Sequence, residues 1–256
     1  MTKQIEVYDM DSYRLQRCLT VPGLESTNDM TACAHNSCAY ISDHSNDCIH
    51  RVGLPHGADV AYWPVNHEPA CLSVTDTHSV LVTCDNCCQL PAGVINDDDK
   101  VRLIKEFSTD GKLLREIQLP QTVASPHHRI QLSNGQFIIC HGYHRDPIHR
   151  VCLIGSDGRV VMRYGGPKGS GSQQMNMPSH LAVDRNGFVI VADLNYHRVL
   201  LLSPELTYVR DVVSRDQLKW SPLRLFLDVN RRRLYIAVNK WENTKHIAGR
   251  VIVVSV

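Results

Sequence analysis

Residues 177–202 read MPSHLAVDRNGFVIVADLNYHRVLLL. Two short apolar segments flank the turn DRNG at 184–187, and a third follows the polar loop 194–197. An Asn-Gly pair between two apolar runs is a strong signal for a β-hairpin. The stretch therefore predicts three short antiparallel strands, with Asp193 at the end of the second and Arg198 at the start of the third.

The same pattern recurs along the chain. Units begin near Met30, Ala70, Arg129, Leu181 and Leu223. They are about 40 to 60 residues apart, and each has room for four short strands, which is typical of β-propeller blades. The longer intervals contain longer loops between the second and third strands. A sandwich or an up-and-down barrel would also give regular strands, but it would not explain a recurring Asp-loop-Arg in each unit.

Several residues match a known repeat pattern, in which Pro, Ala and Asp precede a Gly, an Ala-Asp pair, an Asn and an Arg. In the unit quoted above these are Pro178, Ala182, Asp184, Gly187, Ala192, Asp193, Asn195 and Arg198. In the first full unit Asp43, Asn46 and Arg51 match the second half of the pattern. The chain thus resembles the NHL-repeat β-propeller family, as in tripartite-motif and Brat-like proteins, over nearly its whole length. The resemblance implies a propeller that usually has six blades.

We accordingly predict one all-β domain over residues 1–256, a β-propeller of NHL type with six blades. Five units begin with a first strand, and two further strands are expected at 4–8 and 13–19. A five-bladed or incomplete ring is the alternative, and the count would fit a chain truncated or excised from a longer protein.

Composition narrows the classes of partner. The chain carries 27 Lys and Arg against 26 Asp and Glu, so its net charge of +1 gives no global field for nucleic acid or membrane. No apolar run approaches the roughly 18 to 20 residues of a membrane-spanning helix, and the first 15 residues lack a signal-peptide core. We therefore expect a cytoplasmic protein with ten reduced cysteines, no membrane partner and no DNA partner.

Two groups of residues in the sequence could bind a metal ion. The loop thiols Cys84, Cys87 and Cys88 could bind zinc, but no second cysteine pair lies at a suitable spacing. His141, His144 and His149 lie close together in the sequence, but a His-x-x-His spacing is a weak signal of a metal site without an identified third and fourth ligand. We therefore predict no metal, no cofactor and no catalytic residues.

The recurring aspartates and arginines are interpreted as structural clamps. A carboxylate that ends one strand can bind an arginine at the start of the next and so fix the loop. Repetition in several blades is expected of a clamp and not of a single active site. The predicted clamps are Asp43 with Arg51 and Asp193 with Arg198.

Binding is expected on the loops between second and third strands and on the links between blades. Histidine, arginine and aromatic residues on loops of a rigid scaffold favour recognition, although each could simply be a solvated loop residue. The candidates are His44, Asn46, His127, His128, Arg129, His141, Tyr143, His144, Arg145, Asn195, Tyr196, Asn239, Lys240 and Trp241.

The resemblance implies a non-enzymatic scaffold whose loop face recognises a protein partner. Single-stranded RNA binding through the His/Arg/aromatic loops is the alternative, which the neutral charge and the acidic run at 97–99 weaken. A gluconolactonase-like hydrolase with a central divalent cation, or a lyase with a central zinc, is the second alternative.

Overall fold

The structure, a computed structural model, describes residues 3–55, 57, 60–85, 102–143, 146–169, 171, 173–242 and 245–256. For residues 85, 241, 242 and 245–248 it describes the backbone but not the side chain. Strands dominate throughout, so the predicted all-β class is confirmed. None of the helices in these ranges is long and apolar enough to span a membrane. The chain divides into two compact units, residues 1–118 and 119–256.

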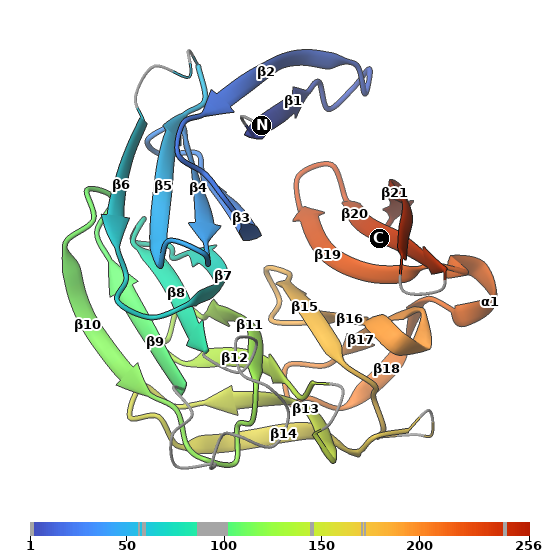
Figure 1. The fold of residues 1–256 in the computed structure, drawn as a ribbon. Helices are drawn as coiled ribbons and strands as arrows, with labels where there is room; N and C mark the ends of the chain where they lie inside the picture. Colours follow the sequence, from blue (N-terminus) through green and yellow to red (C-terminus); the bar gives the residue numbers. More distant parts are fainter. Residues whose placement is uncertain are drawn as a thin grey trace. The chain divides into compact units, whose positions relative to one another are not determined.

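The first unit contains a strand pair followed by two four-stranded antiparallel meanders (Figure 1). The strands are β1 (Lys3–Tyr8), β2 (Leu15–Val21), β3 (Thr27–Cys33), β4 (Cys38–Asp43), β5 (Cys48–Gly53), β6 (Val60–Pro64), β7 (Pro69–Val74), β8 (Val80–Asp85), β9 (Arg102–Phe107) and β10 (Leu113–Gln118). The first strands of the two meanders, β3 and β7, lie side by side. Tyr40, Trp63 and Phe107 fill the core between these meanders.

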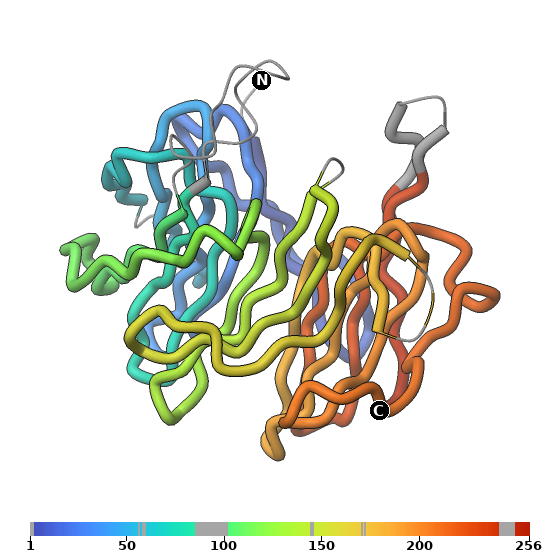
Figure 2. The backbone as a smooth tube through the Cα atoms, turned by 90° about the horizontal axis from the view of Figure 1, so that it is seen from below, coloured from blue at the N-terminus to red at the C-terminus, as the bar shows by residue number. Residues whose placement is uncertain are grey.

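The second unit contains two four-stranded meanders and a three-stranded one. Its elements are β11 (Pro126–Gln131), β12 (Phe137–His141), β13 (Ile148–Ile154), β14 (Val160–Pro167), β15 (Pro178–Val183), β16 (Val189–Asp193), the 3-10 helix η2 (Leu194–Tyr196), β17 (Arg198–Leu202), β18 (Tyr208–Val213), α1 (Arg215–Leu218), β19 (Ser221–Asp228), β20 (Arg233–Glu242) and β21 (Lys245–Ser255). The first strands β11, β15 and β19 are successive neighbours. Figure 2 shows the orange and red strands of this unit running side by side.

The five meanders are the blades of a β-propeller fold, because each runs from a first to a last strand in order and successive first strands are neighbours within each unit. Among the described residues there are five such sheets, which is the five-bladed alternative and not the expected six. The second strands are buried on both faces, as in β16, where every side chain is buried. This explains why the second strands appear in the sequence as continuous apolar runs.

One long loop predicted from the sequence is instead a hairpin. Residues 239–242 and 245–249 continue the ladder of β20 and β21, with Asn239 opposite Gly249 and Lys240 opposite Ala248. Asn239, Lys240 and Trp241 therefore lie on β20 and not in a loop. Polar composition alone suggested a loop, but cross-strand pairing extends these strands by several residues.

The start of each first strand carries a register irregularity. The shifts fall between Thr27 and Met30, Pro69 and Cys71, Pro126 and Arg129, Pro178 and His180, and Pro222 and Arg224. A bulge redirects the side chains beside it. The residues at these five positions are therefore placed differently from an ordinary strand residue.

Candidate functional site

An ion pair closes the hairpin quoted above. Asp193, the last residue of β16, lies opposite Arg198, the first residue of β17. Arg198 Nε donates to Asp193 Oδ2 at 2.8 Å, and the guanidinium also donates to the Gln174 carbonyl at 2.8 Å. Asp193 Oδ1 accepts the Asn176 N–H at 2.8 Å. The expected pair is present, and it ties the loop to the segment that enters the blade.

The aspartate at the same place in the first blade has a different partner. Asp43 ends β4 opposite Cys48, while Arg51 lies three residues further along β5. Because side chains alternate along a strand, Arg51 projects from the other face of the sheet. Asp43 Oδ2 lies 3.3 Å from His50 Nε2 and 2.9 Å from Asn46 Nδ2. The predicted Asp43–Arg51 pair is therefore wrong, and His50 and Asn46 hold this carboxylate.

A second recurring contact joins one blade to the next and was not foreseen from the sequence. A side chain beside the bulge accepts a backbone N–H from the following first strand. The three contacts, which we call the inter-blade hooks, are Asp29 Oδ2 with Leu72 N–H at 2.8 Å, His128 Nδ1 with Leu181 N–H at 3.3 Å, and His180 Nδ1 with Leu225 N–H at 3.3 Å. Each acceptor lies two residues after the first residue of its strand, which is the sequence signal that could have identified it.

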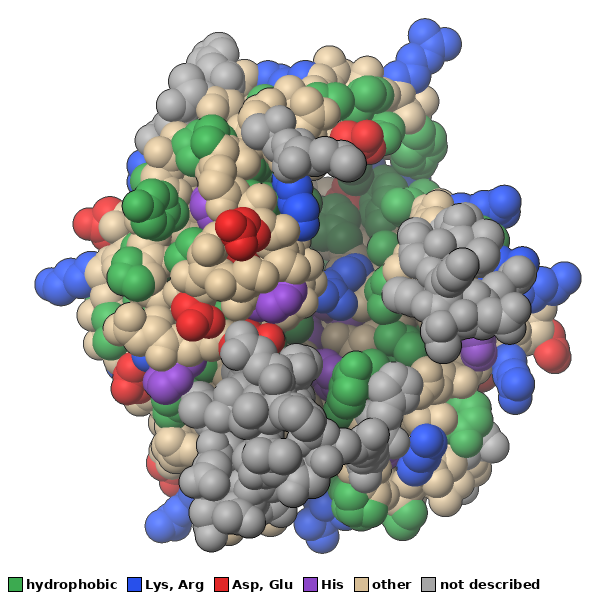
Figure 3. Space-filling model, in the orientation of Figure 1, with side chains coloured by type: hydrophobic (Ala, Val, Ile, Leu, Met, Phe, Trp, Pro, Cys, Tyr) green, Lys and Arg blue, Asp and Glu red, His purple; other side chains and the backbone are tan. Residues whose placement is uncertain are grey.

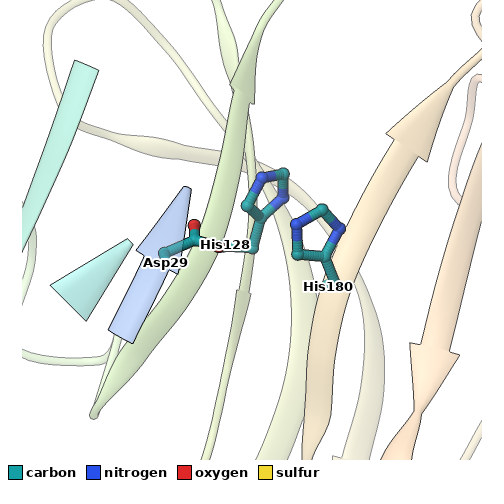
Figure 4. Close-up of side chains that lie close together, drawn as sticks. All are labelled: Asp29, His128 and His180. Carbon is teal, nitrogen blue, oxygen red and sulfur yellow. The ribbon is translucent and has the colours of Figure 1, made fainter. Parts of the chain in front are cut away.

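Two of the hooks stack on each other. Figure 4 shows His128 on β11 and His180 on β15 with their rings side by side, and the ring centroids are 3.6 Å apart. Because Nδ1 of each ring accepts a backbone N–H, the neutral ring carries its proton on Nε2. The pair therefore serves as a structural contact between blades.

Other predicted binding residues also lie inside strands. His127, His128 and Arg129 belong to β11 and not to a link between blades, and His141 ends β12. Arg129 and His141 are 0% exposed. Burial, together with the charge of a nearby arginine, lowers the pKa of His127 and of His141 to about 4. These side chains do not form an exposed loop face, which corrects the prediction for them.

The remaining predicted binding residues differ in their exposure to solvent. Tyr143, Asn46 and Lys240 are exposed, whereas His44, Asn195, Tyr196 and Asn239 are half-buried. Asn195 donates to Asn176 Oδ1 at 3.2 Å, so it too has a local structural contact. His144, Arg145, Cys87, Cys88 and the side chain of Trp241 lie outside the described residues. Cys84 is buried in β8.

The second unit contains a groove that the sequence did not reveal. It has a volume of about 460 Å³, within the range of ligand sites. It lies where the 184–187 turn and strands β16 to β18 meet the end of β19 and the turn that follows it. Its lining residues are Asp184, Arg185, Asn186, Phe188, Ile190, Leu201, Arg210, Val212, Leu227, Val229, Arg232 and Val256. We call it the arginine groove.

The arginine groove combines an apolar floor with a cationic rim. Phe188, Leu201 and Leu227 are among the half-buried side chains of the floor. The rim arginines Arg185, Arg210 and Arg232 are exposed. Among the lining side chains there are three guanidinium groups and a single carboxylate, that of Asp184. Arg185 is held across the two blades by a 2.6 Å hydrogen bond to Asn230 Oδ1.

Comparisons with known proteins identify the fold and nothing finer. No protein-family model matches the chain, and no curated protein matches it in sequence. A protein of unknown function from Bacteroides caccae is similar in structure (TM-score 0.65, 14% identity, 93% of this chain and 79% of that chain). Virginiamycin B lyase from Staphylococcus aureus is also similar (TM-score 0.58, 13% identity, 100% of this chain and 74% of that chain). A chain of a nidogen/laminin complex is similar too (TM-score 0.63, 14% identity, 97% of this chain and 90% of that chain). These neighbours are β-propellers of mixed function.

Proposed function

We propose that this chain is a non-enzymatic binding module, an NHL-type β-propeller that takes a segment of a partner protein into the arginine groove. The observation that carries the proposal is the groove itself, in which three exposed guanidinium groups surround partly exposed apolar side chains. Arginine beside apolar surface is characteristic of the centres of protein interfaces. The partner segment carries an acidic side chain next to an aromatic or aliphatic one, because this composition complements both the rim and the floor.

The NHL assignment is supported by the residues that match the repeat pattern and by their contacts. Asp193 and Arg198, two of the matching residues, form the ion pair that closes the hairpin. A propeller in a nidogen/laminin complex is a structural neighbour, which is consistent with protein recognition on this fold.

The non-enzymatic proposal is supported by how the titratable side chains are used. His128, His180 and Asp29 accept backbone N–H groups, and Asp193 binds Arg198. These contacts give the four side chains a structural role in the fold. We also propose a cytoplasmic location, in which the ten cysteines of the sequence would be kept as reduced thiols.

The test is a selection of peptides from a random display library on the purified chain. We expect enrichment of sequences in which Asp or Glu adjoins an apolar residue. The variant Arg210→Glu/Arg232→Glu should bind the selected peptide at least about tenfold more weakly, because like charges in an interface are costly. The matched control is Arg159→Glu, in the turn between the third and fourth strands of another blade. The Arg159 side chain is 88% exposed. This variant should bind the peptide as the unmodified chain does.

A parallel selection with random single-stranded RNA at two salt concentrations tests the alternative ligand class. Figure 3 shows Lys and Arg side chains of the described residues interspersed with acidic and neutral ones on the face drawn. We therefore expect no salt-sensitive enrichment of RNA. Enrichment of RNA without enrichment of peptides, or peptide binding unaffected by the double arginine variant, would contradict the proposal.

A further inference from the structure

The first blade contains three potential metal ligands that the proposed function does not use. Asp43 ends β4, and Cys48 and His50 lie two residues apart on β5. Cys48 is directly opposite Asp43, so all three side chains project from the same face of the sheet. They are 0%, 6% and 3% exposed, and their ligand atoms lie within 4.8 Å of one another.

We propose that Asp43, Cys48 and His50 form a zinc site. Zinc binds carboxylate oxygen, imidazole nitrogen and thiolate sulfur at about 2.0 to 2.3 Å in tetrahedral geometry, which places a bound oxygen about 3.3 Å and a bound sulfur about 3.6 Å from the bound nitrogen. In the structure Asp43 Oδ2 lies 3.3 Å and Cys48 Sγ lies 3.5 Å from His50 Nε2. The distances from His50 Nε2 to the other two donors therefore already match two edges of a zinc tetrahedron, and all three donors lie within 4.8 Å of one another. The fourth position would be taken by water.

Comparison with the fourth blade shows why a cation suits this position. Asp193 and Asp43 both end the second strand, and both accept backbone N–H groups from the segment that enters the blade. The residue opposite Asp193 is Arg198, whereas the residue opposite Asp43 is Cys48. The first blade thus keeps the carboxylate and replaces the permanent cation by a thiol and an imidazole. A metal ion would restore the positive charge that the fourth blade obtains from arginine.

The carboxylate is already oriented by surrounding donors. Asp43 Oδ2 accepts the Glu25 N–H at 2.8 Å and Asp43 Oδ1 accepts the Ser26 N–H at 3.0 Å. Asn46 Nδ2 also donates to Oδ2 at 2.9 Å. Hydrogen bonds of this kind fix ligand orientation and are a usual part of a metal site.

Binding would involve a defined transfer of protons and charge. The Cys48 thiol loses its proton to solvent, and neutral His50 binds through Nε2 with its proton on Nδ1. One thiolate and one carboxylate together balance the two charges of the zinc ion. The bound cluster is then neutral, which favours its burial.

The test uses the full chain, dialysed against a chelator and then titrated with zinc in competition with a chromophoric chelator. We expect one equivalent of zinc to bind and the thermal midpoint to rise. Cobalt should give the charge-transfer absorption of a thiolate-bound ion. Cys48→Ser should weaken zinc binding by at least about a hundredfold and abolish that absorption, since loss of even an orienting partner costs 10- to 100-fold.

The matched control is Cys152→Ser in the third blade. Cys152 Sγ also lies 3.5 Å from a histidine nitrogen, His141 Nε2, but these two residues are not part of a three-ligand cluster among the described residues. This control should bind zinc as the unmodified chain does. His50→Gln provides a second ligand variant, and thermal unfolding without zinc establishes that each variant is folded. Failure of the unmodified chain to bind zinc, or one-to-one binding that survives Cys48→Ser, would overturn the proposal; the latter would place the metal elsewhere, as at Cys84, Cys87 and Cys88.

Discussion

The imidazole rings of His128 and His180 act as acceptors for the backbone of the neighbouring blade. A buried N–H that loses its acceptor costs about 1 to 3 kcal/mol, so a hook stabilises the fold through the group that it satisfies. The hook residue differs between blades, with a carboxylate at Asp29 and imidazoles at the other two. What recurs is the acceptor and its position beside the bulge.

Two substitutions of His180 distinguish the contribution of its hydrogen-bond acceptor to stability from the contribution of ring packing. His180→Leu removes the acceptor of the Leu225 N–H, so the free energy of unfolding should fall by about 1 to 3 kcal/mol. His180→Asn places a side-chain oxygen near the site of Nδ1 and should recover at least half of that loss. Chemical denaturation measures both. Equal stability of the two variants would mean that packing, and not the hydrogen bond, accounts for the contribution of this residue.

The Asp193–Arg198 clamp should also be measurable. Arg198→Ala leaves a buried carboxylate without its cation and should lower the free energy of unfolding by about 1 to 3 kcal/mol at pH 7. Burial raises the pKa of Asp193 to about 6, and the loss of Arg198 would raise it further. Lowering the pH to 5 therefore favours the protonated carboxyl group, and the deficit should be smaller there. Arg159→Ala is the exposed control, and a neutral result for Arg198→Ala at pH 7 would disprove the clamp.

At the scale of elements, the turn 184–187 shapes one wall of the arginine groove. The Asp184 carboxylate accepts the N–H groups of Asn186 and Phe188 at 2.9 and 2.8 Å. Gly187 has a φ of +83°. This conformation costs L-amino-acid residues energy, although Asn tolerates it better than Ala does. The turn is therefore specified by its own residues and does not depend on a ligand.

Substitution of Gly187 tests this local specification. Gly187→Ala should lower the free energy of unfolding by about 1 kcal/mol because of the positive φ. Gly187→Asn should lower it by less than half as much. Equilibrium unfolding of the two variants decides the matter; if Ala is tolerated as well as Asn, the turn does not hold this conformation in solution.

The elements that the sequence predicted are those whose signal is local. The Asn-Gly turn, the apolar second strands and the Asp193–Arg198 pair each depend on residues within one hairpin. The partner of Asp43 was missed because the repeat is degenerate there and strand alternation turns Arg51 away. The hooks and the arginine groove were missed because they need two neighbouring blades. Pairing between β20 and β21 likewise overrode the polar composition of 239–249.

At the scale of the whole molecule, stability should depend on pH through buried histidines. Burial lowers the pKa of His127 and His141 to about 4, whereas both titrate near 6.5 when unfolded. Between these values the unfolded chain binds more protons, so the free energy of unfolding falls as pH falls. Asp193 acts in the opposite direction. Because its pKa is raised in the folded state, the folded chain takes up this proton at a higher pH than the unfolded chain does. Two histidines outweigh one aspartate, so a net loss is expected from pH 6.5 to pH 4.5.

The double variant His127→Gln/His141→Gln provides the matching test. It removes the two histidine contributions and leaves that of Asp193. The pH dependence should therefore flatten or reverse in this window. The free energy of unfolding is measured by denaturant titration at several pH values, and a chain whose stability rises from pH 6.5 to pH 4.5 without these substitutions would contradict the burial of the two rings.

The central claim is that a partner protein binds in the arginine groove. Backbone hydrogen exchange of the full chain, measured with and without the selected acidic and apolar peptide, tests it most directly. We predict slower exchange at 184–188 and 229–232, the two turns that border the groove, and unchanged exchange at 194–197, at the other end of β16. Protection of 194–197 and of Tyr143 with no change at the groove would contradict the claim and would place binding on the loops between second and third strands.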